Sequence, residues 1–152
     1  MSFDLLVLNG PNLNLLGQRE PEHYGAETLD DIARRTGRRA AELGAEVTFR
    51  QSNDEAELIG WIQDSRNRFD GLVVNAGAFT HTSLAILDAL QSFDGPIVEV
   101  HLSNIFRREE FRHRSYVSQV ATGVICGFRG QGYIMGVEAL VALLTQNEQT
   151  DK

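Results

Sequence analysis

The chain has 152 residues, of which 42% are hydrophobic and 23% charged, a size and composition that suit one globular domain with a buried core. The formal net charge of −7 disfavours a nucleic-acid partner, because binding to phosphates needs a basic surface. A lone cysteine, Cys126, leaves no intrachain disulfide, and the only lysine, Lys152, lies at the end of the chain, where it cannot provide the fixed, desolvated amine of Schiff-base catalysis.

Short apolar runs alternate with longer segments of helical periodicity. The short runs are rich in Val and Ile and predict buried parallel strands, whereas the longer segments predict helices with one apolar face. In the first helix, Thr28 is a candidate N-cap and Gly44 a candidate residue just past its end. In chain order we expect a strand at 5–9, a helix at 29–43, a strand at 47–51, a helix from about 53, a strand at 72–75, a helix at about 82–92, strands at 97–102 and 123–127, and a helix at about 132–146.

This alternation favours an α/β fold in which helices cover both faces of a parallel sheet. Five strands suggest a flavodoxin-like three-layer sandwich with the strand order 2-1-3-4-5. No repeat or linker divides the sequence, so residues 1–152 are expected to form a single domain, with a disordered tail from about 147. No apolar stretch approaches the ~20 residues of a membrane span, and no signal peptide is recognisable, so we expect a cytoplasmic protein without a membrane partner.

Two long irregular segments, 10–27 and 103–121, follow the carboxyl ends of the first and fourth strands. Loops of this length in a compact domain are usually functional or disordered. In the expected order, strands 1, 3 and 4 are neighbours, and sheets of this kind bind ligands beyond the carboxyl ends of their strands. The sequence therefore predicts a site built from the segments that follow strands 1, 3 and 4.

Polar residues are concentrated in those three segments. Asn12 follows strand 1, and Asn75 and His81 follow strand 3. Glu99 and His101 are two residues apart on strand 4, so their side chains face the same side of the sheet. A carboxylate can orient an imidazole and favour its protonated form, although the pair could also be a buried structural ion pair. His81, just before a predicted helix start, is equally compatible with an exposed histidine.

Arg19 and Tyr24 lie in the long segment after strand 1. A tyrosine hydroxyl ordinarily has a pKa near ~10, and lowering it to ~7.5 would take about 3.4 kcal/mol of tyrosinate stabilisation. One or two arginines in a water-poor site could supply that energy. From these residues alone, an exposed loop tyrosine beside a solvated arginine is the simpler interpretation.

Three ordered motifs resemble those of the type II 3-dehydroquinate dehydratases. The first is NGPNLNLLG at 9–17, followed by REP at 19–21 and YG at 24–25. The second is NAGA at 75–78 with Thr80, His81 and Ser83, and the third is EVH at 99–101 followed by SN at 103–104 and the segment 107–115. The resemblance covers about residues 5–144 and implies a flavodoxin-like fold, in agreement with the prediction from periodicity.

The resemblance also implies a reaction. Members of this family dehydrate 3-dehydroquinate to 3-dehydroshikimate by anti elimination through an enolate, without cofactor or metal. On this basis Tyr24 would be the base, with its pKa lowered by Arg19 and with help from Arg108, and Asn12 would hold a water at the enolate oxygen. His101, oriented by Glu99, would protonate the leaving hydroxyl. The reaction would belong to the shikimate pathway of aromatic amino acid biosynthesis or to quinate breakdown.

Substrate binding and assembly are likewise implied by the resemblance. The residues expected to grip the carboxylate and ring hydroxyls are Asn75, His81, Leu102, Ser103 and Arg112. Leu102 stands where an isoleucine is commoner, which matters little if the contact is made by the backbone. Family members commonly form dodecamers built from trimers, in which an acidic residue corresponding to Asp88 can reach a neighbouring active site. We therefore expect a homododecamer, a tetramer of trimers, with a small-molecule substrate.

Two other classes of function remain open on the sequence. A nucleotide- or flavin-dependent oxidoreductase would need the fingerprint G-x-G-x-x-G, but after Gly130 and Gly132 the third glycine position is occupied by Met135. Tight packing of a helix on a strand is the simpler use of these glycines. A non-catalytic module that binds small polyhydroxy acids would need the gripping residues but not the acid and base.

Overall fold

The computed structural model describes residues 2–18 and 25–151 and contains a five-stranded sheet. The strands are β1 (Phe3–Asn9), β2 (Ala45–Gln51), β3 (Gly71–Asn75), β4 (Ile97–His101) and β5 (Gly123–Cys126). All neighbouring pairs are parallel, and the order is β2-β1-β3-β4-β5. The predicted strand order and fold class are thus confirmed, with ends that differ from the prediction by at most two residues.

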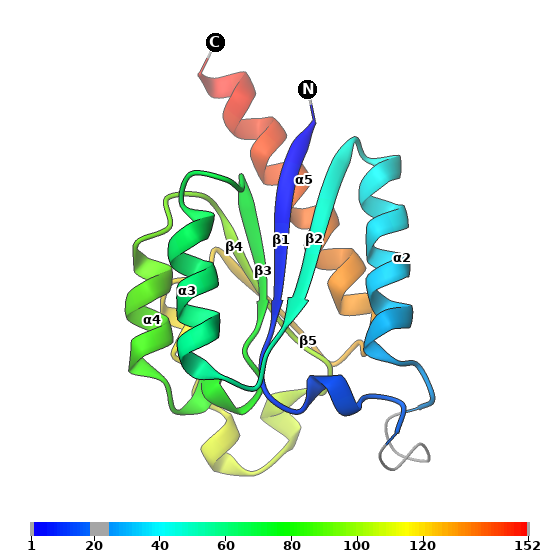
Figure 1. Cartoon of the computed structure of the whole chain (residues 1–152), viewed down its shortest axis with the longest axis vertical. Helices are drawn as coiled ribbons and strands as arrows, with labels where there is room; N and C mark the ends of the chain where they lie inside the picture. The colour runs from blue at the N-terminus through cyan, green and yellow to red at the C-terminus, as the bar shows by residue number, and fades with distance from the viewer. Residues whose placement is uncertain (1, 19–24, 152) are drawn as a thin grey trace.

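Four longer helices cover the two faces of the sheet, as Figure 1 shows, with α3 and α4 on one face and α2 and α5 on the other. Their bounds are α2 Leu29–Glu42, α3 Glu55–Ser65, α4 Leu84–Gln91 and α5 Gln131–Thr150. Short 3-10 turns lie at η1 Leu13–Leu15, η2 Gly77–His81, η3 Ile105–Arg107, η4 Glu110–Arg112 and η5 Val117–Gln119. Within the described ranges no helix has the length and apolar character needed to cross a membrane.

Capping residues explain where the helices begin. Thr28 caps α2 by accepting a hydrogen bond from the N–H of Asp31, whose carboxylate accepts one from the N–H of Thr28 in return. Ser83 caps α4 by accepting a hydrogen bond from the N–H of Ile86, so this helix starts two residues later than predicted. The helix α5 continues to Thr150, so the predicted disordered tail from about 147 is wrong up to that residue; the last turn is extended by backbone bonds and by the Thr150 hydroxyl.

The apolar core consists of two layers, one on each side of the sheet. Alternating residues of β1 supply both, since Leu6 packs with Ile62 and Leu90 on the α3/α4 face while Leu5 packs with Val137 on the α2/α5 face. All five side chains are at most 1% exposed, and each such side chain contributes about 1.5–3 kcal/mol relative to full exposure. This packing fixes the relative positions of the strands, and hence of the loops that leave them.

All five strands end at the same edge of the sheet, which lies at the bottom of Figure 1 together with the 3-10 turns. The pairing register places Asn75, the last residue of β3, beside Asn9, the last residue of β1. His101 ends β4 at the same edge. Polar residues that are far apart in the sequence are therefore neighbours before any loop contributes to the site.

Candidate active site

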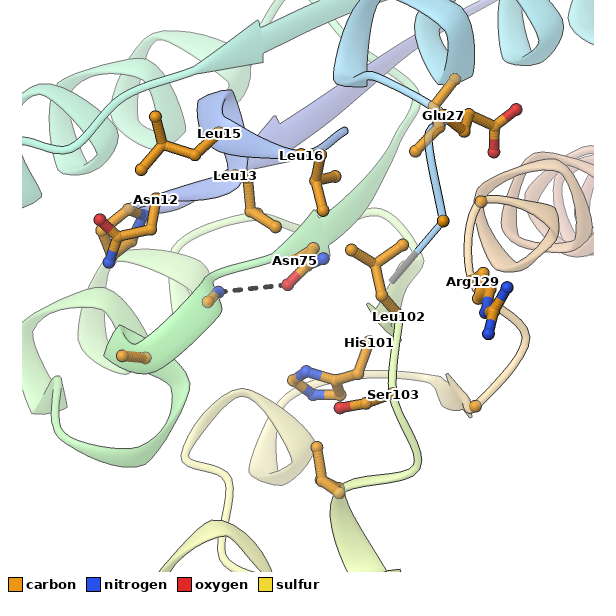
Figure 2. Close-up of a pocket in the computed structure, with 18 of the residues that line it drawn as sticks. Asn12, Leu13, Leu15, Leu16, Glu27, Asn75, His101, Leu102, Ser103 and Arg129 are labelled. Atoms are coloured by element: carbon orange, nitrogen blue, oxygen red, sulfur yellow. Dashed lines mark hydrogen bonds between the residues drawn. The ribbon is translucent and has the colours of Figure 1, made fainter. Parts of the chain in front are cut away.

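A cavity of about 810 Å³ opens at the carboxyl edge of the sheet, where the sequence predicted a site. Its wall comes from the segments after β1, β3 and β4, joined by the turn between β5 and α5. Figure 2 shows Asn75, His101 and Ser103 on this wall, with Leu102 beside them and Arg129 on the turn. The expected site residues that line the cavity are Asn12, Asn75, His81, His101, Leu102, Ser103, Arg108 and Arg112.

Of the other four residues named from the sequence, two lie outside the described part of the chain and two are described but do not line the cavity. Arg19 and Tyr24 lie outside the described residues. Glu99 is buried beneath His101 and reaches the cavity only through that histidine. Asp88 is exposed on α4 and is not part of the cavity lining within this chain.

The loops after β1 and β3 approach each other closely because Gly10 has no side chain. A Cβ at Gly10 would lie 2.1 Å from the carbonyl oxygen of Ala76, which is far inside contact distance. Two residues further, Asn12 adopts a left-handed conformation with φ 69°, and its N–H donates to Asn53 Oδ1 at 2.9 Å. Asparagine tolerates this region better than most residues, so the sequence Gly-Pro-Asn suits the turn that brings Asn12 to the cavity.

His101 and Glu99 form the buried pair that their spacing on β4 predicted. The Nε2–H of His101 donates to Glu99 Oε2, and the two residues are only 5% and 1% exposed. A carboxylate cannot donate, so the shared proton lies on Nε2 when Glu99 is ionised. Among the described residues the other ring nitrogen, Nδ1, has no hydrogen-bond partner, and His101 lines the cavity. This nitrogen can hold a proton and release it to a ligand.

Hydroxyl groups hold the far side of the Glu99 carboxylate. Ser115 donates to Oε2 at 2.7 Å and Ser118 to Oε1 at 2.5 Å, while Thr80 contacts the Ser115 hydroxyl at 2.5 Å. Burial raises the pKa of Glu99, but the hydrogen bonds from His101 and the two serines outweigh it, so the net pKa lies below its ordinary value. The carboxylate is therefore ionised at neutral pH, where it can orient His101.

This hydroxyl network was not identified in the sequence. Ser115 and Ser118 lie in the long segment after β4, which folds back over the strand from which Glu99 projects. Ser115 does fall within the third motif, at the end of the segment 107–115, and this was the one available signal. Nothing in the local spacing links Ser118 to Glu99, since their contact spans 19 residues.

His81 ends η2, shortly before α4 begins at Leu84, and its ring faces the ring of His101. The two ring centres are 6.5 Å apart with an angle of 15° between the planes. His81 Nδ1 lies 2.7 Å from the carbonyl oxygen of Arg114, and a carbonyl can only accept, so Nδ1 carries a proton. In the neutral ring, Nε2 is thereby left as an acceptor for a hydroxyl group.

Asn75 is fixed by two hydrogen bonds on opposite sides of its amide. Its Nδ2 donates to the hydroxyl of Tyr133 at 2.8 Å, and its Oδ1 accepts from the N–H of Gly77 at 3.2 Å, the bond dashed in Figure 2. Tyr133 falls in the segment at about 132–146 that the sequence predicted as a helix with one apolar face. Its hydroxyl is instead part of the support beneath the site.

Three arginines, Arg108, Arg112 and Arg129, give the cavity a positive wall although the whole chain is acidic. Arg108 Nη1 donates to the Ser103 hydroxyl at 3.3 Å, and Arg112 Nε donates to Glu109 at 2.9 Å. Guanidinium groups match the geometry of carboxylates, so this wall suits an anionic organic ligand. Within residues 2–18 and 25–151, no three His, Cys, Asp or Glu side chains gather in a way that could hold a metal ion.

The glycines at the start of α5 serve packing. A Cβ at Gly132 would lie 3.2 Å from a methyl group of Val100, and one at Gly136 would lie 3.3 Å from its other methyl group. Both distances are tighter than ordinary contacts, so these glycines let α5 lie close on β4. The interpretation that the sequence favoured for Gly130 and Gly132, tight packing of helix on strand, agrees with this geometry at Gly132.

Comparisons with known proteins agree with the geometry. The family model described as "Dehydroquinase class II" matches residues 3–141. A 3-dehydroquinate dehydratase of Streptomyces coelicolor is 56% identical over 140 residues, which cover 91% of this chain and 89% of that protein. The corresponding protein of Dinoroseobacter shibae is 55% identical over 141 residues, covering 93% and 94%.

Solved structures give the same result. The crystal structure of a type II dehydroquinase from Propionibacterium acnes superposes with a TM-score of 0.89 at 45% identity, covering 93% of this chain and 98% of that chain. A type II dehydroquinase from Butyrivibrio crossotus superposes with a TM-score of 0.85 at 41% identity, covering 91% and 97%. The likeness therefore extends over nearly the full length of both proteins.

Proposed function

This chain belongs to the class II dehydroquinase family, and from that premise we propose how its residues dehydrate 3-dehydroquinate to 3-dehydroshikimate. The observation that carries the proposal is the pair of Glu99 and His101: a buried, ionised carboxylate holds one nitrogen of an imidazole that lines the cavity. Such a pair suits the delivery of a proton to a leaving hydroxyl. The proposed dehydration of 3-dehydroquinate belongs to the shikimate pathway.

The reaction removes one proton and one hydroxyl from adjacent ring carbons. A base takes the proton from the carbon next to the ketone, and the electron pair moves to the ketone oxygen to give an enolate. The enolate then reforms the ketone as the carbon–oxygen bond to the tertiary hydroxyl breaks, and the hydroxyl leaves as water after accepting a proton. Each of the two proton transfers can contribute a rate factor of roughly 10²–10⁴ when the acid and base are well positioned.

His101 is the proposed acid. Protonated at both nitrogens, the ring keeps its Nε2–H on Glu99 and donates from Nδ1 to the departing hydroxyl. Glu99 stabilises the charged ring before the transfer and keeps its plane fixed. Ser115 and Ser118 keep the carboxylate in place and ionised, so they act on the reaction through Glu99.

Tyr24 is the proposed base, with Arg19 lowering its pKa and Arg108 helping from the cavity wall. The first two residues lie outside the described part of the chain, so the proposal rests on the motif match at 19–25. Gly25, the first described residue after this segment, is part of the cavity lining. Asn12, also on the lining, is proposed to hold a water at the enolate oxygen.

The carboxylate and ring hydroxyls of the substrate are proposed to be held by Asn75, His81, Arg112 and the backbone of Leu102 and Ser103. Arg112 supplies positive charge, and the neutral tautomer of His81 offers Nε2 as an acceptor for a hydroxyl. Asn75 offers its second N–H as a donor, since the first is committed to Tyr133. The charge and polarity of the wall therefore suit a hydroxylated ring acid.

We also propose that the chain assembles as a homododecamer, a tetramer of trimers. Large apolar side chains remain exposed on the single chain: Leu84, Phe106, Phe111, Val124 and Phe128 are 43–66% exposed. Contacts between chains would bury such residues. In the assembly, the exposed Asp88 on α4 would reach the site of a neighbouring chain, which agrees with its absence from the lining of its own cavity. Sedimentation at micromolar concentration tests the assembly, and a monomer would refute it.

A direct assay tests the reaction and its residue roles together. The purified, chelator-treated protein is mixed with 3-dehydroquinate, and the absorbance of the conjugated enone product is followed. We expect turnover in the wild type, near-complete loss in Tyr24→Phe with ligand affinity retained, and normal turnover in the matched control Tyr116→Phe, whose hydroxyl makes no hydrogen bond within the described residues. No product from folded wild-type protein would instead favour a binding module.

A separate variant tests His101 as the proposed acid. His101→Ala should lower kcat much more than it weakens ligand binding, because the proposed contribution arises in the transition state. A pure loss of affinity with unchanged kcat would show that His101 only binds the substrate. Borohydride added with substrate should leave the enzyme active, since no imine forms, and a trapped covalent adduct would overturn the enolate mechanism.

A further inference from the structure

The hydroxyl of Tyr133 joins the ends of two neighbouring strands beneath the active site. Tyr133 lies in the first turn of α5, and none of its surface is exposed. Its hydroxyl donates to Asn9 Oδ1 at 2.6 Å and accepts from Asn75 Nδ2 at 2.8 Å. Asn9 is fully buried at the end of β1, whereas Asn75, at the end of β3, lines the cavity. The phenol thus connects a buried amide to one at the site.

Each hydrogen bond in this chain of groups can run in only one direction. Asn9 Nδ2 donates to the carbonyl oxygen of Arg50 at 3.0 Å, and a carbonyl can only accept, so the amide oxygen of Asn9 must face Tyr133. The single proton of the phenol is therefore committed to Asn9. Its oxygen can only accept from the other side, so Asn75 must turn its nitrogen toward the phenol.

The opposite end of the Asn75 amide agrees with this direction. The N–H of Gly77 donates to Asn75 Oδ1 at 3.2 Å, which requires the oxygen on that side. Turning the amide over would set two N–H groups against each other at Gly77 and two oxygens against each other at Tyr133. Because the phenol and both asparagines are at most 3% exposed, water has little access to relieve either clash.

We propose that Tyr133 is a positioning residue for substrate binding: it locks the amide of Asn75 so that the cavity always meets one free N–H of Asn75 as a donor. This inference rests on the proposed role of Asn75 as a substrate ligand. The group recognised would be an oxygen acceptor of the substrate, such as a ring hydroxyl or a carboxylate. Tyr133 itself does not reach the ligand, since it is not part of the cavity lining.

Tyr133 is also chemically distinct from the proposed base. Burial raises its pKa well above the ordinary value for a tyrosine, and the bond from Asn75 offsets only part of that increase. The hydroxyl therefore stays protonated over the whole working range and keeps its bond to Asn9. A role in binding geometry, and none in proton transfer, follows from this.

The test is a double-mutant cycle of Tyr133→Phe and Asn75→Ala, read by KM and kcat for 3-dehydroquinate, with Tyr116→Phe as the matched tyrosine control. If one oriented donor is lost, Tyr133→Phe should raise KM by about 5- to 30-fold and change kcat by less than about 3-fold. In the Asn75→Ala background the same substitution should change KM by less than about 2-fold, because the residue it positions is absent.

Other outcomes separate the proposed positioning role of Tyr133 from the proposed role of Asn75 as a substrate ligand. A raised KM in Asn75→Ala together with a normal KM in Tyr133→Phe would overturn the positioning role and leave Asn75 as a ligand. A normal KM in Asn75→Ala would overturn both. An equal change of KM in both backgrounds would mean that Tyr133 is merely structural, which would also refute the proposal. If Tyr133→Phe does not fold, Asn9→Ala replaces it: this removes the acceptor of the phenol proton, and a normal KM would sink the proposal equally.

Discussion

The serine beneath Glu99 offers a prediction whose size can be worked out from its contacts. Ser115 is 7% exposed and bridges two buried groups, since it donates to Glu99 Oε2 and accepts from the fully buried Thr80 hydroxyl. Ser115→Ala removes a hydrogen bond to a charged group, which contributes about 1.5–3 kcal/mol, and leaves the Thr80 hydroxyl without a partner, at a cost of about 1–3 kcal/mol. Because Thr80 and Glu99 can adjust, we expect about 3 kcal/mol in total.

The same carboxylate supplies the control. Ser118 also donates to Glu99, at Oε1, but Ser118 is exposed, so water can replace its hydroxyl. Ser118→Ala should therefore cost less than about 1 kcal/mol. For a domain of this size the thermal midpoint should fall by roughly 6–12 °C in Ser115→Ala and by no more than about 4 °C in Ser118→Ala. Thermal unfolding at one fixed protein concentration measures both, because the proposed assembly would make the midpoint depend on concentration. Equal small losses in the two variants would refute the interpretation of Ser115 as a buried bridge.

Two further predictions concern the pH dependence of stability and the approach of two loops. The folded pKa of Glu99 lies below its ordinary value of 4.5, so its contribution to stability is complete above pH 4.5 and is lost as the pH falls toward the folded pKa. In an acid titration, the stability of Glu99→Gln should therefore decline less steeply than that of the wild type. An unchanged slope would contradict this. Gly10→Ala places a Cβ against the Ala76 backbone and should cost about 3 kcal/mol or more and abolish turnover. Gly60→Ala, in an open position of α3, should instead stabilise by about 0.5–1 kcal/mol, and urea unfolding compares the two; a mild effect at Gly10 would mean that the loops can separate.

The sequence predicted the fold because the physical signals for it are local. Runs rich in Val and Ile set the strands, and residues such as Thr28 and Gly44 mark the ends of α2 through contacts within one or two turns. The end of α5 was misplaced because the polar residues from 147 onward have no apolar face to reveal a helix. Backbone hydrogen bonds continue a helix without such a face, at least as far as Thr150.

Part of the site was also predictable from the sequence. The alternation of side chains along a strand was enough to pair Glu99 with His101, and strand order was enough to bring Asn12, Asn75 and His101 to one edge. The tautomer of His81 was not predictable, because it depends on the carbonyl of Arg114, 33 residues away. A single sequence carries no record of which backbone groups a loop will turn toward a side chain.

What escaped the sequence has a common physical cause. Ser118 and Tyr133 each look ordinary in their own segment, as a loop serine and an apolar helix residue, and each acts through a contact with another strand. Tyr133 fixes the direction of the hydrogen bond that Asn75 offers to the cavity, whereas Ser118 donates to the carboxylate that orients His101. A group that can only accept a hydrogen bond, such as the carbonyl of Arg50, fixes the direction of the next hydrogen bond, and that bond fixes the one after it. Groups that never contact a ligand therefore determine which atom a site residue presents to the cavity. The precision of this site therefore depends on the buried layer beneath the cavity wall as much as on the wall itself.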